Sequence, residues 1–133
     1  MSDFEQISTH SGFMKHNGGL LFKVISETES EFKTKINENH LNRAGITHGG
    51  YIASIIDAGI GTGVHRANKN NIFVTISLDI KFIGPTKIGD EIIGKVKIEK
   101  ITNSLVFASC KIESKNKIIA VGSGVWKRTN NSF

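Results

Sequence analysis

Apolar and polar residues alternate along two segments near the N-terminus, residues 20–28 and 30–37, which a short polar turn separates. This pattern predicts a β-hairpin. After a loop over residues 38–47, a segment of mostly apolar and small residues runs over residues 49–67. It contains no turn signal until a polar run begins at Asn68. The segment predicts one long helix.

Alternation returns in the second half of the chain, over residues 71–83, 91–114 and 117–128. The middle run is long enough for two strands with a turn near Thr102. The turns between these strands are too short for parallel crossovers and therefore predict an antiparallel sheet. Two strands, one helix and four more strands predict an α+β fold in which a curved sheet wraps the helix.

The strand predicted over residues 71–83 has a regular set of apolar positions on one face, and we expect that face to meet the core. Thr75 belongs to the opposite, polar face and is expected to point away from the core. The apolar positions are Val74, Ile76, Leu78, Ile80 and Phe82.

The predicted helix is apolar or small on every side from His48 to Val64, with Asp57 as its only charge at neutral pH. A helix that is apolar all round is a buried helix. Burying an ionised carboxylate is unfavourable unless it is paired or hydrogen-bonded. Asp57 is therefore either satisfied by neighbouring groups or has a chemical task.

The length of 133 residues fits a single domain, with residues 1–17 as an N-terminal extension in which residues 3–16 can form a short helix. Cys110 is the only cysteine, and its place in an alternating strand predicts a core residue in a reducing compartment. The N-terminus lacks the pattern of a secretory signal, and no apolar stretch approaches the roughly 20 residues that span a bilayer. We therefore expect a cytoplasmic protein without membrane insertion.

The formal net charge of +5 comes from 17 Lys and Arg against 12 acidic residues. Many of the basic residues follow Lys81 and alternate with apolar positions, which is typical of a solvated strand face. A more specific interpretation is attraction to an anionic small molecule, such as a nucleotide-bearing cofactor. Nucleic acid is a weaker candidate partner, because no aromatic residues interleave with the basic ones as stacking platforms.

A pattern with chemical meaning leads into the helix: it reads Asn42-x-x-Gly45-x-x-His48-Gly49-Gly50, and Asp57 follows. N–H groups at a helix start are unpaired and carry partial positive charge, and glycine lets a carbonyl oxygen approach the backbone closely. An oxyanion that formed there would be stabilised. His48, Asp57 and His65 are scattered around the helix, so their spacing does not predict a metal site.

Together with the strand sequence VTISLDIKFIGP, this pattern resembles the hotdog-fold acyl-CoA thioesterases of the phenylacetate-pathway (PaaI-like) group over residues 18–128. The resemblance implies a hotdog fold, in which a curved antiparallel sheet of five to six strands wraps around one long central helix. It also implies hydrolysis of an acyl-CoA thioester to a free acid and coenzyme A. Coenzyme A is then part of the substrate, and no separate cofactor is expected.

The resemblance implies a role for each residue of the pattern. Asp57 is the general base or the nucleophile, and the Gly49 N–H stabilises the oxyanion. Asn42 and His48 help to position the thioester or the attacking water. Thr75 falls where related proteins often carry a serine or threonine near that water.

The coenzyme A side of the site is expected at Gly50, Arg66 and Lys69. The basic side chains of Arg66 and Lys69 suit nucleotide phosphates. Structural explanations compete with these roles. Asn42 is in a position typical of a turn or capping residue, and His48 can cap the helix. Thr75 can be a plain strand threonine. Helix glycines that superficially resemble a phosphate loop follow no strand, so close helix packing explains them better: Gly59, Gly61 and Gly63.

The spacing between Gly49 and Asp57 predicts an assembly. Eight residues at about 1.5 Å each separate their backbones by roughly 12 Å along the helix, so one carbonyl cannot easily contact both groups of one chain. The simplest solution is a two-fold dimer with antiparallel helices, in which Asp57 of one chain faces Gly49 of the other. Such a homodimer, alone or as a dimer of dimers, would also cover the helix face that the sheet leaves open.

Two other functions remain open beside the acyl-CoA thioesterase. A non-catalytic acyl-CoA-binding hotdog protein, acting as a sensor or regulator, would keep the pocket without turnover; its sequence sign is loss of the carboxylate, and Asp57 is present. A hotdog dehydratase or hydratase uses a differently placed His and Asp pair. The main hypothesis is therefore a thioesterase with its active site at a homodimer interface.

Overall fold

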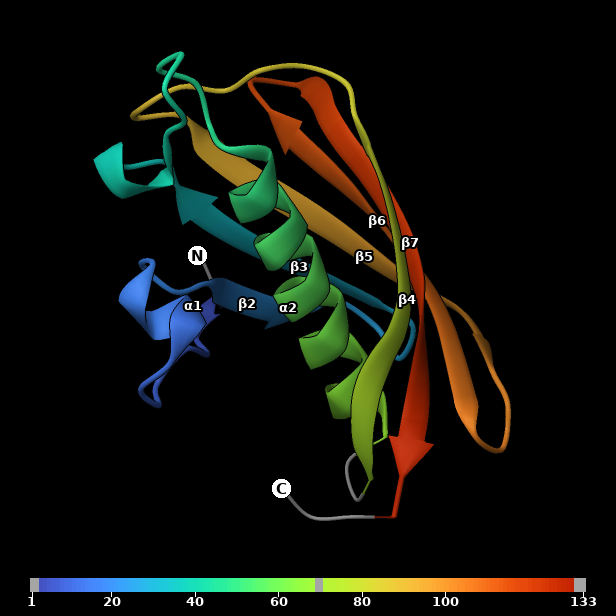
Figure 1. Cartoon of the computed structure of the whole chain (residues 1–133). Coiled ribbons are helices and arrows are strands. Elements are labelled where there is room, and N and C mark those ends of the chain that lie inside the picture. Colours follow the sequence, from blue (N-terminus) through green and yellow to red (C-terminus); the bar gives the residue numbers. More distant parts are fainter. Residues whose placement is uncertain (1–2, 69–70, 131–133) are drawn as a thin grey trace.

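A seven-stranded antiparallel sheet curves around one long helix in the computed structural model, which describes residues 3–68 and 71–130 (Figure 1). The strand order is β1-β2-β3-β5-β6-β7-β4, so β1 and β4 form the two edges. The helices are α1 (Phe13–His16), the 3-10 helix η1 (Glu38–His40) and α2 (Gly49–Ala67). The strands are β1 (Glu5–Gln6), β2 (Leu21–Val24), β3 (Glu29–Lys35), β4 (Ile72–Phe82), β5 (Glu91–Ile101), β6 (Leu105–Ser114) and β7 (Lys117–Thr129).

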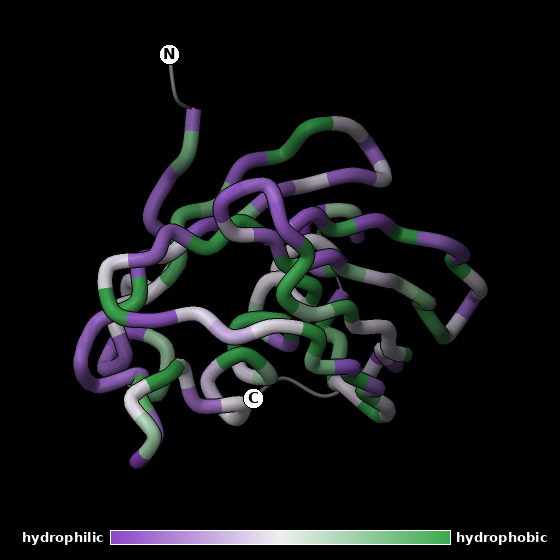
Figure 2. The backbone as a smooth tube through the Cα atoms, turned by 90° about the horizontal axis from the view of Figure 1, so that it is seen from above, coloured by the Kyte–Doolittle hydropathy of each residue, from purple (hydrophilic) through white to green (hydrophobic). Residues whose placement is uncertain are grey.

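The core lies between α2 and the concave face of the sheet, as the fold class predicted from the sequence requires (Figure 1). Polar and apolar residues alternate along much of the chain (Figure 2). Along β5 and β6 buried and more exposed residues alternate, and the buried apolar ones belong to the core. Phe32 is fully buried and lies so close to α2 and β5 that a Cβ on Gly59 or Gly94 would come within 2.2 or 2.1 Å of its ring. Close packing therefore explains Gly59, as expected.

The helix α2 is buried on one side only, which corrects the expectation of a helix buried all round. Its sheet-facing residues are buried, whereas Asp57 and its neighbours on the opposite side remain half-exposed. A sheet that curves around one face cannot cover a helix completely. The half-exposed residues are Ala53, Ser54, Asp57, Ala58, Gly61 and Thr62.

The N-terminal extension is less helical and more sheet-like than predicted. Only Phe13–His16 form a helix, and Glu5–Gln6 pair with β2 as a seventh strand, one more than the five to six expected. The free backbone groups of β2 explain the extra strand, because an uncovered sheet edge accepts another segment. None of the helices in the described ranges is long and apolar enough to cross a membrane.

The strand β4 contains an irregularity that changes which of its side chains meet the helix. Thr75 pairs with Trp126 and Ser77 with Val125, so Ile76 is a surplus residue, a β-bulge. Because side chains alternate with a period of two, one extra residue exchanges the two faces. The predicted alternation is therefore wrong on one side of the bulge: Thr75 faces α2, and Val74 is exposed.

The single cysteine has the place that the sequence predicts. Cys110 on β6 is buried in the core and unpaired. Burial raises the pKa of its thiol to about 12, because an apolar environment disfavours the thiolate. A thiol that stays protonated is a poor nucleophile, so Cys110 is a packing residue.

Candidate active site

The start of α2 presents one free backbone donor. The ring Nδ1 of His48, the N-cap residue, accepts the Gly50 N–H at 2.7 Å, and the His48 carbonyl accepts the N–H groups of Tyr51 and Ile52. Within the described part of the chain, the Gly49 N–H has no hydrogen-bond acceptor. It points outward from the positive end of the helix dipole, which suits a developing negative charge.

This geometry also settles what His48 and Gly50 do locally. His48 caps the helix, the structural explanation that competed with a catalytic role. A Cβ on Gly50 would lie 2.8 Å from the same ring nitrogen, so glycine is needed for the cap to form. A contact of either residue with substrate or coenzyme A stays a prediction.

Asn42 holds the loop that leads to the helix. Its side-chain Oδ1 accepts the N–H groups of Ala44 at 2.9 Å and Ile46 at 3.3 Å, and its own N–H donates to the Ile46 carbonyl. The turn passes through Gly45 at a φ of +83°, a conformation that favours glycine. Asn42 thus shapes the loop, and its contribution to substrate positioning stays a prediction.

A mainly apolar cavity of about 440 Å³ opens beside Gly49. The Asn42 loop, the first turns of α2 and the segment after β4 form its walls. Phe82 of β4 closes one side, with its ring 3.4 Å from where a Cβ on Gly49 would lie. The other lining residues are Ile46, Thr47, Ile52, Ile83, Gly84, Pro85, Thr86 and Ile119.

The carboxylate of Asp57 lies on the half-exposed side of α2 and meets β4. Thr75 Oγ1 donates a hydrogen bond of 2.7 Å to Asp57 Oδ1, which fixes one carboxylate oxygen and leaves the other for a second partner. The bulge in β4 brings the two residues together. Asp57 lies roughly 12 Å along the helix axis from Gly49 of the same chain, so one thioester cannot contact both of these groups.

Trp126 is a neighbour of this pair that the sequence pattern does not single out. It lies directly opposite Thr75 in the β4–β7 register, and its indole nitrogen is 3.6 Å from where a Cβ on Gly61 would lie. Only the strand register reveals this proximity, because Trp126 and Thr75 are far apart in the sequence.

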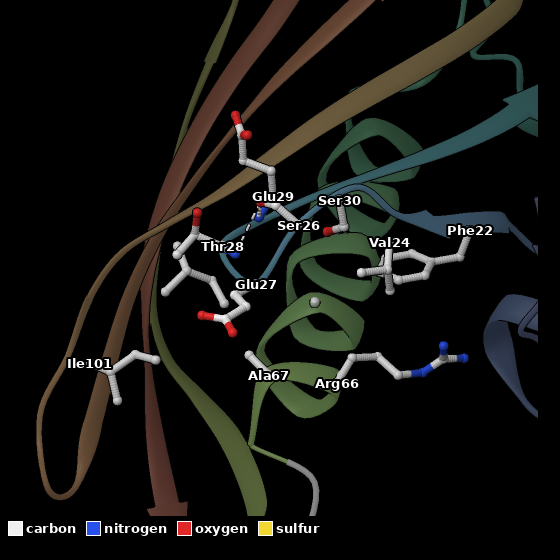
Figure 3. Close-up of a pocket in the computed structure, with 12 residues that line it drawn as sticks. Phe22, Val24, Ser26, Glu27, Thr28, Glu29, Ser30, Arg66, Ala67 and Ile101 are labelled. Atoms are coloured by element: carbon white, nitrogen blue, oxygen red, sulfur yellow. Dashed lines mark hydrogen bonds between the residues drawn. The ribbon is translucent and has the colours of Figure 1, made fainter.

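Arg66, expected on the coenzyme A side, lies elsewhere in a single chain. It is nine residues from Asp57 and therefore on the opposite side of α2. Its guanidinium pairs with Glu5 at 2.8 Å and lies over the Phe22 ring. It borders a separate cavity of about 600 Å³ between the end of α2 and the β2–β3 loop (Figure 3). Lys69 lies outside the described residues.

The curved sheet, the long central helix with Gly49 at its start, and the Asp57 carboxylate on that helix together define a class of protein. These are the features of hotdog-fold enzymes with a carboxylate on the central helix. The sequence profile of the Thioesterase superfamily matches residues 44–120, and the chain belongs to that family. It is a thioester hydrolase.

Curated relatives agree with this assignment. The chain is 29% identical over 124 residues to a putative esterase of Pseudomonas aeruginosa (PA0474), with 92% of each protein covered. It is 32% identical over 90 residues to acyl-coenzyme A thioesterase 13 of Mus musculus, covering 66% of this chain and 64% of that protein.

Solved structures share the fold. The crystal structure of zebrafish thioesterase superfamily member 2 superposes with a TM-score of 0.77 at 23% identity, covering 83% of this chain and 81% of that chain. The Escherichia coli PaaI protein from the phenylacetic acid degradation operon superposes with a TM-score of 0.75 at 18% identity, covering 84% and 81%. At these identities the likeness supports the hotdog fold.

Proposed function

We propose that the protein hydrolyses acyl-CoA thioesters to a free acid and coenzyme A, at two identical sites that a homodimer builds from both chains. One observation carries the proposal: the Gly49 N–H at the start of α2 has no partner among the residues that the structure describes, while the Asp57 carboxylate lies eight residues further along the same helix. Each chain holds two halves of a thioesterase site that cannot reach each other. Two antiparallel helices would bring each half to its complement.

The chemistry follows from the two groups. The thioester carbonyl oxygen would bind the Gly49 N–H of one chain, which stabilises the oxyanion of the tetrahedral intermediate. Asp57 of the other chain would remove a proton from the attacking water, or attack directly as nucleophile. The carbon–sulfur bond then breaks, and the thiolate of coenzyme A takes up a proton. Thr75 would hold the carboxylate in the orientation that either route needs.

The edge strand β4 supports the dimer. It pairs with β7 on one side only, and Val74 and Ile76 on it are 36% and 54% exposed. Unpaired edges with exposed apolar side chains are unusual in monomers, because they invite pairing with another chain. A two-fold partner at this edge would cover these residues and the half-exposed face of α2. The dimer could assemble further into a dimer of dimers.

Acyl-CoA fits as substrate on two grounds. The curated relative acyl-coenzyme A thioesterase 13 carries that substrate in its name. The net charge of +5 favours a ligand with several phosphates.

The free, buried Cys110 fits our proposal that the protein lies in the reducing cytoplasm. Asn42 lines the pocket beside Gly49, and His48 and Gly50 flank Gly49 in the chain. We propose that these residues help to hold the thioester, with Arg66 and Lys69 as candidates for phosphate contacts.

The first experiment measures thiol release from a panel of acyl-CoAs by the wild type and by Asp57→Asn, which keeps the size of the side chain. We expect release by the wild type and a loss on the order of 10³-fold in the variant. Equal rates in the two proteins would remove Asp57 from the mechanism. Tight acyl-CoA binding without any thiol release would instead identify a sensor or regulator.

A second experiment tests the shared site directly. Gly49→Pro removes the N–H at the first helical position, where proline is well tolerated, and the extended ψ of 133° at His48 suits the residue before a proline. Gly49→Ala is the matched control, because it keeps the N–H and places a Cβ 3.4 Å from Phe82.

Inactive Asp57→Asn and inactive Gly49→Pro chains are then unfolded together and refolded as a mixture. A mixed dimer regains one intact site from the two chains, so random pairing should restore about a quarter of wild-type activity. If each chain held a complete site, mixing would restore nothing. That result, or an active monomer by solution mass, would contradict the cross-chain site.

A further inference from the structure

Trp126 is the only tryptophan of the chain and one of its largest buried side chains, at 2% exposure. It lies on β7 directly opposite Thr75 of β4. Side chains directly opposite each other in an antiparallel pair share a face, with Cβ atoms about 5 Å apart. The indole therefore lies next to the threonine that holds Asp57, on the same side of the sheet.

The indole N–H has no hydrogen-bond partner among the described residues. In the same part of the chain, no side-chain nitrogen or oxygen is both sealed from solvent and unpartnered. The small exposed area of Trp126 must therefore include its N–H, which reaches a point that water can enter. An indole nitrogen only donates, so that point suits an acceptor.

The positions of two glycines show how the indole is oriented relative to the face of α2 that carries Asp57. A Cβ on Gly124 would lie 2.8 Å from the far carbons of the ring, so the ring lies flat along β7. At its other end, the nitrogen is 3.6 Å from the position of a Cβ on Gly61. Gly61 is one turn beyond Asp57 on the same side of α2. The water-accessible point thus lies beside the helix face that carries Asp57.

We propose that the Trp126 N–H holds the attacking water against Asp57; this inference rests on the proposed hydrolysis. Asp57 Oδ1 is occupied by Thr75, which leaves Oδ2 as the acceptor for one proton of the water. The water oxygen accepts the indole N–H with one lone pair and directs the other at the thioester carbon. On attack, the carbon–oxygen bond forms, the proton passes to Asp57 and the carbon–sulfur bond breaks. A water needs two or more polar partners to be held, and these two groups supply them.

A packing role alone would also bury a tryptophan at this position, so the test changes the N–H and leaves the ring. Because the chain has one tryptophan, growth on an analogue with sulfur in place of the indole N–H alters this position alone. We expect kcat for acyl-CoA hydrolysis to fall on the order of 10-fold, with KM changed less than about threefold. Trp126→Phe should show the same kcat effect with some loss of thermal stability.

Phe22→Leu is the matched control for a smaller buried aromatic residue, because Phe22 is fully buried near Arg66, on the other side of α2 from Asp57. It should lower the melting temperature and leave kcat unchanged. Wild-type kcat in the sulfur analogue, with Asp57→Asn inactive, would overturn the role of Trp126 and leave the proposed function intact. Full activity in Asp57→Asn would overturn the proposed function itself.

Discussion

The two sides of α2 differ in how closely they are packed against the rest of the chain. The sheet-facing side is packed so closely that Gly59 leaves no room for a methyl group beside Phe32. The other side carries Asp57 and is half-exposed, and Thr75 holds one oxygen of the carboxylate. Tight packing holds the helix in place, and the loosely covered side is left for chemistry. Substitutions on the two sides should therefore separate activity from stability.

The largest effect is expected from Asp57→Asn on the open side. Thiol release should fall about 10³-fold, because the variant has no base or nucleophile, while the free energy of unfolding changes by less than about 1 kcal/mol. Steady-state hydrolysis and urea unfolding measure the two quantities. A large loss of stability would show that Asp57 is needed for packing and would weaken the contrast.

At the start of α2, Gly49→Pro should lower kcat about 10²-fold relative to Gly49→Ala, because only the proline variant lacks the oxyanion donor. The melting temperatures of the two variants should agree within a few degrees, since both residues fit the first helical turn. Similar kcat values in the pair would show that the carbonyl oxygen binds a different donor.

On the packed side, Gly59→Ala should destabilise the protein by about 3 kcal/mol, since a Cβ there would come within 2.2 Å of the Phe32 ring. The folded fraction should keep its kcat. Urea unfolding gives the first quantity, and activity per folded molecule gives the second. Gly61→Ala is the stability control, because its Cβ would meet nothing closer than 3.6 Å.

The smallest effect is expected from Thr75→Val, which keeps the shape of the side chain and removes one hydrogen bond to Asp57. A loss of about 1 kcal/mol in transition-state stabilisation corresponds to a roughly fivefold drop in kcat. Thr75→Ser keeps the hydroxyl and should retain most of the activity. Equal kcat in the valine and serine variants would show that Thr75 is a plain strand residue.

The features that the sequence predicts correctly are those that depend on residues close together in the chain. The bounds of α2 follow from the His48 cap and the polar residues after Ala67, and both signals lie within a few residues of the helix ends. The hairpin of β2 and β3 and the antiparallel sheet followed from alternation and short turns. Asp57 stood out because it is the only charge in an apolar segment.

The features that sequence reasoning missed depend on how distant strands align. A bulge depends on the register between β4 and β7, and a regular alternation in the sequence conceals it. The alternation therefore predicts the wrong face for Thr75, and nothing in the sequence connects Trp126 with the site. The pairing of Glu5–Gln6 with β2 is likewise a contact that no pattern within residues 3–16 predicts.

The bulge at Ile76 has a consequence for how this protein can change. It divides β4 into two segments of opposite phase: Phe73 and Thr75 face the helix before it, and Leu78 and Ile80 face the helix after it. Ile76 is the residue that β7 does not match, so its loss would leave Thr75 and Leu78 two residues apart in one regular alternation, with both side chains still facing the helix. The bulge is therefore a point at which β4 can become one residue shorter while the set of inward-facing side chains is kept.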